Sequence, residues 1–337
     1  MIDSIYINNS GGKILLDYLI VMLEKREIKV HYLLDSRVIH NHPEIINNKV
    51  TYLESGVLKR YAFYKENRDT FSKVLCFGNL PPFLKLNAEV FTYFHQSLFL
   101  KVSKEFSFAQ KMQFRIKSRV LSGIKNNTDY WLVQSKIMKD ALELKYNLSS
   151  QKVKILPFYP PLEKDTNFVR IKHTFLYVSG GYPHKNHIRL IDAFCRFYDS
   201  YHFGELILTV SADFVSIISL INQKINNGYP ITNLGFVKRD ELYEVYQKAE
   251  FFIFPSLTES FGLGLIEAIE CGCKVIGADL PYTYEVCEPS IVFNPLDEKS
   301  FIEAFKNSLN EDVKISVPRI KNNINKLINI LQENPCN

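Results

Sequence analysis

The chain alternates short apolar runs with amphipathic stretches, and this alternation limits the folds that are open to it. In the second half, the apolar runs occupy 173–180, 204–212, 231–237, 249–256 and 274–279. Stretches with apolar residues at helical spacing lie between them, at 186–200, 213–225, 240–249 and 262–272. Strands that alternate with helices form a parallel sheet with helical crossovers. The sequence therefore predicts an α/β fold of the doubly wound type.

The first half carries the same pattern less regularly. We expect a strand at 4–9 (SIYINN), a glycine turn at 10–12 and a helix at 13–27. Further strands are expected at 29–35, 73–78, 89–95, 129–135 and 152–158. Prolines after this last run forbid regular structure, so a boundary is placed near 157–170. The predicted domains are 1–160 and 161–320, with an amphipathic helix in 321–337 that crosses back to the first domain.

Composition excludes several classes of protein. The chain has 337 residues, of which 46% are hydrophobic and 23% charged, so it can form two ordinary cores and does not have the composition of a disordered protein. Its net charge of +5 is mild, and because no recognised nucleic-acid-binding module occurs, no nucleic-acid partner is expected. The six cysteines are expected to be reduced thiols. Since we find neither a signal peptide nor an apolar window of spanning length, we expect a cytoplasmic protein.

Two glutamates, Glu259 and Glu267, bracket the start of a helix predicted directly after a strand. The first N–H groups of a helix have no intrahelical partner, so Ser260, Phe261 and Gly262 can offer theirs to a phosphate. Glu267 lies more than one turn inside the helix and can accept hydrogen bonds from a diol such as a ribose. Glu259 can accept them from the hydroxyls of a sugar. The alternative is that Glu259 is a helix-start acid and Glu267 a solvated residue.

This stretch resembles the retaining glycosyltransferases of family 4, whose hallmark is Glu, seven residues, Glu after a strand that ends in FPS. The resemblance is clear over roughly 173–295. It implies the GT-B fold, in which two doubly wound Rossmann-like domains face each other across a cleft. It further implies that Glu259 contacts the donor sugar and Glu267 the ribose of the nucleotide. The helix start, from Ser260 to Leu263, would then contact the diphosphate.

A second motif places Lys185 at the start of a predicted helix. An ammonium group at a helix start suits a diphosphate leaving group. The family has a lysine here, often with an arginine several residues before it. This chain has Gly180 and Gly181 in that place, so Lys238 or Arg239 is considered as the substitute. The alternative is that Lys185 is a solvated helix cap.

Further donor contacts follow from the same resemblance. Gly11 and Gly12 resemble the glycine loop that family members hold over the donor phosphates, with a simple turn requirement as the alternative. His95 ends a predicted strand where the family often has a histidine that touches the donor sugar, and a structural role is the alternative. Gly235 and Phe236 fall where a family loop lines the nucleotide base.

The stretch 97–125 is predicted to form one basic amphipathic helix. Its predicted apolar face contains Leu98, Val102, Phe106, Ala109, Met112, Ile116 and Val120. The basic residues on its other side are Lys101, Lys104, Lys111, Arg115 and Arg119. Such a helix is typical of an element that lies on an anionic membrane surface. Binding of an anionic acceptor and ordinary packing on the sheet are the alternatives.

The resemblance implies a retaining hexosyltransferase that uses a nucleoside diphosphate sugar, with Glu259, Lys185 and His95 as catalytic residues. No Asp-x-Asp occurs in the sequence, so we expect no metal and no cofactor. The expected acceptor is a glycan or lipid-linked oligosaccharide of bacterial O-antigen or capsule synthesis, at the inner face of the cell membrane. The alternatives are a sugar-nucleotide epimerase, a phosphorylase and a non-catalytic sugar-nucleotide binding protein.

Overall fold

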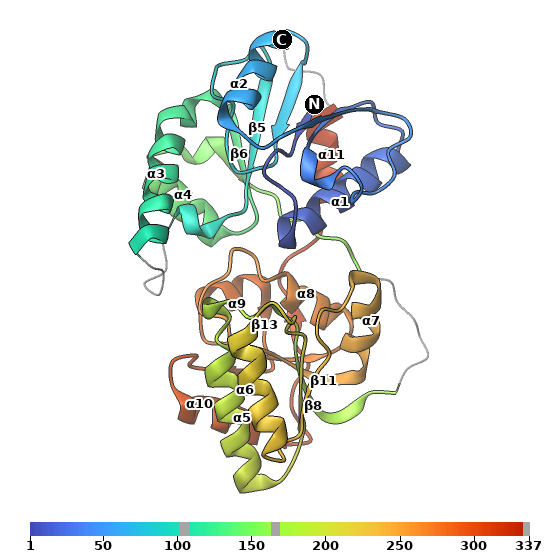
Figure 1. Cartoon of the computed structure of the whole chain (residues 1–337), viewed down its shortest axis with the longest axis vertical. Coiled ribbons are helices and arrows are strands. Elements are labelled where there is room, and N and C mark those ends of the chain that lie inside the picture. Colours follow the sequence, from blue (N-terminus) through green and yellow to red (C-terminus); the bar gives the residue numbers. More distant parts are fainter. Residues whose placement is uncertain (101–107, 163–168, 333–337) are drawn as a thin grey trace. The chain divides into compact units, whose positions relative to one another are not determined.

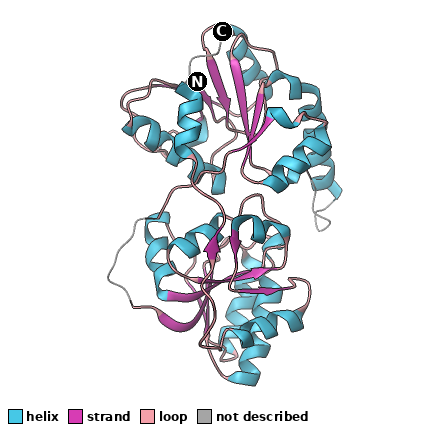
Figure 2. Cartoon of the chain, turned by 180° about the vertical axis from the view of Figure 1, so that it is seen from behind, coloured by secondary structure: helices cyan, strands magenta, loops and turns pink. Residues whose placement is uncertain are grey.

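Two compact units make up the computed structural model, which describes residues 1–100, 108–162 and 169–332. The first unit comprises Met1–Pro160 and the chain from Lys321 onward, and the second comprises Pro161–Ile320. Within each unit a parallel sheet lies between helices (Figures 1 and 2). The prediction of two doubly wound α/β units is therefore confirmed.

Seven parallel strands form the sheet of the first unit, in the order β3-β2-β1-β4-β5-β6-β7 among the described residues. They are β1 Ile2–Asp3, β2 His31–Asp35, β3 Lys49–Leu53, β4 Lys73–Cys76, β5 Glu89–Phe94, β6 Tyr130–Val133 and β7 Val153–Ile155. The strand order reverses between β1 and β4. Crossovers on the two sides of such a reversal leave in opposite directions, which opens a crevice at the carboxyl ends of the strands.

The helices of the first unit come from both ends of the chain. They are α1 Ser10–Lys25, α2 Val57–Glu66, α3 Phe108–Ile124, α4 Lys136–Tyr146 and α11 Ile324–Gln332. Figure 1 shows α11 beside α1. Ile324, Leu327 and Ile328 of α11 are buried. Just before this helix, Asn322 Nδ2 donates to the Tyr159 carbonyl at 2.6 Å, so the C-terminal segment is tied to the first unit.

The strand expected at 4–9 and the glycine turn at 10–12 were wrong. The strand is β1, Ile2–Asp3, and a turn follows it because the Asp3 carboxylate accepts the Ile5 N–H at 3.1 Å. Tyr6 then has a φ of 84°, which no strand residue adopts. Gly11 and Gly12 lie inside the first turn of α1.

The prediction of a single helix over 97–125 was also wrong. A 3-10 turn covers Ser97–Phe99 in place of an α-helix, and the described part of α3 is Phe108–Ile124. The residues from 101 to 107 lie outside the described part of the chain, and Lys101 and Lys104 are among them.

Six parallel strands form the main sheet of the second unit, in the order β10-β9-β8-β11-β12-β14 among the described residues. They are β8 Ile171–Tyr177, β9 Glu205–Leu208, β10 Ile231–Asn233, β11 Ala249–Phe254, β12 Lys274–Ala278 and β14 Ile291–Phe293. The helices are α5 His187–Tyr201, α6 Val215–Asn226, α7 Arg239–Lys248, α8 Leu263–Glu270, α9 Pro281–Val286 and α10 Glu298–Asn307. Two short strands, β13 Cys287–Glu288 and β15 Val317–Pro318, form an antiparallel pair. The reversal here lies between β8 and β11.

Candidate functional site

The loops after β8 and β11 bring Lys185 and Glu259 together at the reversal of the second sheet. Lys185 Nζ lies 2.5 Å from Glu259 Oε1, and the two side chains are 19% and 13% exposed. Because β8 and β11 are neighbours and parallel, both loops leave from the carboxyl edge of the sheet. Open α/β sheets bind their ligands at this position.

Hydrogen bonds fix the backbone around Lys185. The Tyr177 hydroxyl donates to the Lys185 carbonyl at 3.0 Å. Asn186 has a φ of 62°, and its buried Nδ2 donates to the carbonyls of Pro255 at 3.2 Å and Pro295 at 2.9 Å. The loop after β8 is thus tied to the loop after β11. With its side chain four-fifths covered and ion-paired, Lys185 is not the solvated cap of the alternative interpretation.

Glu267 is buried on α8 and is held by α7. Its side chain is 6% exposed, and Oε1 lies 2.5 Å from Arg239 Nη1. The Tyr246 hydroxyl donates to Oε2 at 3.1 Å. A Cβ on Gly264 would lie 3.1 Å from Phe252 Cζ, so glycine lets α8 approach the sheet closely. The interpretation of Glu267 as a solvated residue was therefore wrong.

The start of α8 depends on a glycine. Gly262 is the N-cap with a φ of 76°, in the left-handed region that favours glycine. The helix begins at Leu263, so Ser260 and Phe261 lie in the loop before it. Phe261 is buried. The four residues predicted to bind phosphate therefore form a loop, an N-cap and a first helical position.

Phe214 fills the space beside Gly180 and Gly181. A Cβ on Gly181 would lie 2.7 Å from Phe214 Cβ, and one on Gly180 would lie 3.2 Å from Phe214 Cε2. Larger side chains would therefore displace this phenylalanine. Lys238 and Arg239 were considered as substitutes for the family's arginine. Arg239 pairs with Glu267, and Lys238 is the N-cap of α7.

The predicted base-contacting residues lie beyond the end of β10. Gly235 has a φ of 72°, and a Cβ on it would meet no atom within 4 Å. Phe236 is 78% exposed. This exposed loop leads directly into α7, the helix that holds Glu267.

Two histidines near Lys185 were not predicted. Burial and the neighbouring Lys185 ammonium lower the pKa of His184, while the Glu259 carboxylate acts in the opposite direction. Burial, followed by the Lys185 charge, lowers the pKa of His187 to about 4. Its ring packs on Tyr177, with the ring centroids 4.8 Å apart. Both imidazoles are therefore neutral at neutral pH.

In the first unit, Gly12 and His95 lie in contact. A Cβ on Gly12 would lie 2.8 Å from His95 Cε1, whereas one on Gly11 would meet no atom within 4 Å. The backbone N–H of His95 donates to Asn79 Oδ1 at 2.7 Å, and the ring Nε2 of His95 lies 3.2 Å from the Phe77 carbonyl. Burial lowers the pKa of His95 to about 4. A neutral imidazole and a helix start thus meet at the carboxyl edge of this sheet.

The apolar stripe predicted for the basic helix is exposed on α3. Phe108 is 76%, Met112 37% and Ile116 53% exposed, while Leu121 on another face is buried. The predicted basic residues Lys111, Arg115 and Arg119 are also on this helix. Packing of this stripe on the sheet, one of the alternatives, was wrong. Among the described residues, no helix is both long and apolar enough to cross a bilayer.

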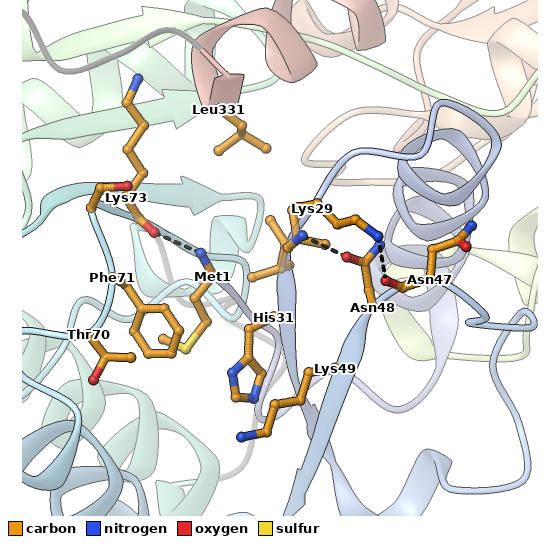
Figure 3. Close-up of a pocket in the computed structure, with 13 residues that line it drawn as sticks. Met1, Lys29, His31, Asn47, Asn48, Lys49, Thr70, Phe71, Lys73 and Leu331 are labelled. Carbon is orange, nitrogen blue, oxygen red and sulfur yellow. Dashed lines mark hydrogen bonds between the residues drawn. The ribbon is translucent and has the colours of Figure 1, made fainter.

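A separate cavity of about 400 Å³ opens in the first unit (Figure 3). Met1, His31, Lys49 and Lys73 line it from the amino ends of β1, β2, β3 and β4. Gly12 and His95 follow the carboxyl ends of strands, which in a parallel sheet form the opposite edge. The cavity is therefore not part of the candidate site.

Three residues that contact the candidate site residues were not predicted from the sequence. They are Asn79, Phe214 and Tyr246. Tyr246 had a signal, because it lies seven residues after Arg239 and hence on the same face of α7. Asn79 follows the end of β4, where polar residues face the crevice, and it has a φ of 67°. We find no sequence signal that would have placed Phe214 against two glycines.

A protein-family model matches the second unit. Residues 161–326 match the model of the family described as "Glycosyl transferases group 1". The O-antigen chain mannosyltransferase RfbU of Salmonella typhimurium is 31% identical over 205 residues, which are 60% of this chain and 56% of that protein. The chain therefore spans little more than half the length of this curated relative.

Solved structures share the fold. Sucrose-phosphate synthase from Thermosynechococcus elongatus matches with a TM-score of 0.71 at 19% identity, covering 92% of this chain and 89% of that one. Anabaena Alr3699/HepE in complex with UDP-glucose matches with a TM-score of 0.67 at 14% identity, again covering 92% and 89%. At such identities the likeness shows the fold alone. Residues 161–326 thus match the glycosyl transferases group 1 family model, in a chain with the GT-B fold.

Proposed function

We propose that the protein is a retaining, metal-independent glycosyltransferase that moves a hexose from a nucleoside diphosphate sugar to a hydroxyl of a glycan acceptor. The observation that carries this proposal is the pair formed by Lys185 and Glu259, 2.5 Å apart at the reversal of the second sheet. The pair lies inside the domain that matches group 1 glycosyl transferases. Glu267 follows Glu259 with seven residues between them, the spacing of the retaining glycosyltransferases of family 4 that this stretch resembles.

The proposed mechanism stabilises the leaving group with fixed positive charge. The Lys185 ammonium and the N–H groups at the start of α8 bind the diphosphate, where charge develops as the bond to the sugar breaks. Glu259 accepts hydrogen bonds from the sugar hydroxyls. The acceptor oxygen forms its bond to the anomeric carbon on the side that the diphosphate leaves. Bond formation on this same face gives retention of configuration. The departing phosphate oxygen takes the acceptor proton.

The nucleotide has its own proposed contacts. Glu267 accepts from the ribose, and Gly235 and Phe236 contact the base. In the first unit we assign Gly11, Gly12 and His95 to donor binding. A pKa of about 4 keeps His95 neutral, so it can exchange hydrogen bonds with sugar hydroxyls without adding charge.

We propose a glycan or lipid-linked oligosaccharide of bacterial O-antigen or capsule synthesis as the acceptor. The mannosyltransferase relative named for the O-antigen chain supports this choice. The protein would then be cytoplasmic and bind the inner face of the cell membrane. The exposed stripe of α3 and its basic residues, which include Lys111, Arg115 and Arg119, support an anionic bilayer as the partner.

The nucleotide site is tested by calorimetric titration with UDP, GDP, ADP and dTDP. One nucleotide should bind, and Glu267→Ala should weaken it. With the sugars of that nucleotide, Lys185→Ala should abolish transfer to a lipid-linked acceptor, whereas Lys299→Ala, at an exposed site on α10, should not. EDTA should leave the rate unchanged, and NMR of the product should show retained configuration. If no nucleotide binds, or if Lys185→Ala retains turnover, the proposal is wrong.

The membrane partner is tested by co-sedimentation with vesicles. Met112→Glu with Ile116→Glu should abolish binding to vesicles that contain phosphatidylglycerol, because both side chains belong to the exposed stripe. Val215→Glu is the matched control, since Val215 is 73% exposed on α6 of the second unit. Equal binding by both variants, or no binding by the wild type, would contradict the membrane proposal.

A further inference from the structure

The α7 helix holds both carboxylate oxygens of Glu267. Arg239 Nη1 lies 2.5 Å from Oε1, and the Tyr246 hydroxyl donates to Oε2 at 3.1 Å. Arg239 is the first residue of α7, and Tyr246 follows two helical turns later on the same face. One rigid element therefore fixes the direction of both donors.

Because the Glu267 carboxylate is buried, it depends on these two donors. The Glu267 side chain is 6% exposed and Tyr246 is fully buried, while Arg239 is 29% exposed. A carboxylate removed from water needs a paired charge and filled hydrogen-bond positions. Burial, and then the Glu267 charge, raise the pKa of Tyr246 well above its ordinary value. The phenol therefore keeps its proton and remains a donor.

The hydrogen bonds from Arg239 and Tyr246 leave some lone-pair sites of the Glu267 carboxylate unoccupied. Each carboxylate oxygen offers about two lone-pair sites, so four are available on Glu267. Arg239 takes one on Oε1 and Tyr246 takes one on Oε2. Each oxygen can then accept one more hydrogen bond. Two acceptors on one carboxylate match two neighbouring hydroxyls, which is the pattern of a ribose.

We propose that Arg239 is a positioning residue that orients the Glu267 carboxylate toward both ribose hydroxyls and thereby sets a preference for ribonucleotides over deoxyribonucleotides. The inference rests on the proposed function, in which Glu267 binds the ribose. It gives Arg239 a different task from the phosphate contact considered from the sequence. Arg239 acts through Glu267 and carries no step of the transfer itself.

The test combines a protein change with a ligand change. Calorimetry would measure binding of UDP and GDP and of their 2′,3′-dideoxy forms to the wild type, Arg239→Gln and Glu267→Gln. Arg239→Gln should weaken binding of the ribonucleotide about tenfold or more, the size of a hydrogen bond to a charged group. For the dideoxy form, wild type and variant should differ less than about twofold, because the two changes act on one interaction. Arg239→Lys should restore part of the loss.

Two further variants separate positioning from folding. Arg196→Gln is the matched control, because Arg196 pairs with Glu298 at 2.6 Å elsewhere in the second unit. This variant should keep the wild-type preference. Tyr246→Phe removes the second donor while the ring remains, so it should also reduce the preference for the ribose.

Three other results of these titrations would contradict the inference. Equal loss of the ribose and dideoxy forms in Arg239→Gln would overturn the inference, because Arg239 would then act on the phosphates or on the fold. A loss in Glu267→Gln without one in Arg239→Gln would overturn it while leaving the proposed function intact. If the wild type binds neither nucleotide, the inference fails together with the nucleotide site on which it rests.

Discussion

At the scale of single residues, the buried charged side chains that the structure describes form ion pairs within each unit. Asp3 and Arg60 form such a pair in the first unit, with 2.7 Å between Oδ2 and Nη2 and side chains 1% and 2% exposed. Arg60 also donates to the carbonyls of Pro81 and Leu80 at 2.9 Å and 2.8 Å. This network ties α2 to the end of β1 and to the loop after β4.

Removing Arg60 should therefore destabilise the first unit. Arg60→Ala leaves Asp3 as an unpaired buried charge, for which we expect a loss of about 3–5 kcal/mol in the free energy of unfolding. Urea denaturation followed by circular dichroism measures it. Lys59→Ala is the neighbouring control, since Lys59 pairs with Glu54 at the surface and is 55% exposed. If the two variants unfold at the same urea concentration, the buried network does not stabilise the fold as argued.

The buried His187 should make stability depend on pH. Its pKa is about 4 in the folded protein and about 6.5 in an unfolded chain. Between these values the unfolded chain binds a proton that the folded one does not, so stability falls as the pH drops from about 6.5 toward 4. From pH 7 to pH 5 this residue should account for a loss of about 2 kcal/mol.

Urea unfolding of His187→Gln at both pH values checks this prediction. The variant should lose less stability than the wild type by the amount that His187 contributes. His40→Gln, at an exposed position in the first unit, should retain the wild-type dependence. An unchanged pH dependence in His187→Gln would show that this histidine is not the group that titrates.

At the scale of elements, the first turn of α1 packs against His95, the residue that follows β5. A Cβ on Gly12 would approach His95 Cε1 to 2.8 Å, whereas one on Gly11 would reach open space. Gly12→Ala should therefore displace the imidazole and cost about 1–3 kcal/mol, as overpacking does. Gly11→Ala should stabilise the protein by up to about 1 kcal/mol, because alanine favours a helix over glycine.

Thermal unfolding and the NMR signals of the His95 ring separate the two substitutions. Gly12→Ala should lower the melting temperature and move those signals, and Gly11→Ala should leave the signals in place. A shift of the His95 signals in both variants would contradict the contact between Gly12 and His95.

Elements whose faces are buried on both sides could be predicted from the sequence. The inner strands β8, β11 and β12 of the second sheet are apolar, and they lie within the predicted runs or differ by about two residues at an end. The edge strand β3 was missed because its residues are half-buried or exposed, which removes the apolar contrast. The helix α3 was misjudged for a different reason. Periodicity indicates an apolar stripe but does not say what covers it.

The partners of the two glutamates could not be predicted in the same way. Their spacing is local and resembles a known family, but Lys185 lies 74 positions from Glu259 and Arg239 lies 28 from Glu267. Only the sheet order, which places β8 beside β11, brings the first pair together. Ion pairs between loops of different strands depend on topology, and local periodicity carries no information about them.

At the scale of the whole molecule, the first unit is discontinuous in sequence. It needs α11, whose Leu327 is fully buried, to complete the packing beside α1. Leu327→Ala should destabilise the first unit by about 2–5 kcal/mol. Hydrogen exchange should then accelerate in residues 1–160 and not in residues 161–320. Lys326→Ala, one exposed position earlier, should change neither, and a uniform acceleration in Leu327→Ala would mean that the two units do not unfold separately.

This discontinuity also sets an order of events during synthesis. A ribosome delivers the chain from its amino end, so every residue of the second unit is available before α11. Until α11 is made, the earlier-made first unit exposes to water the apolar surface that α11 covers. The first unit therefore cannot complete its packing before the whole of the second unit has been synthesised. A ribosome that stalls within 161–320 would release a chain whose first unit cannot be completed.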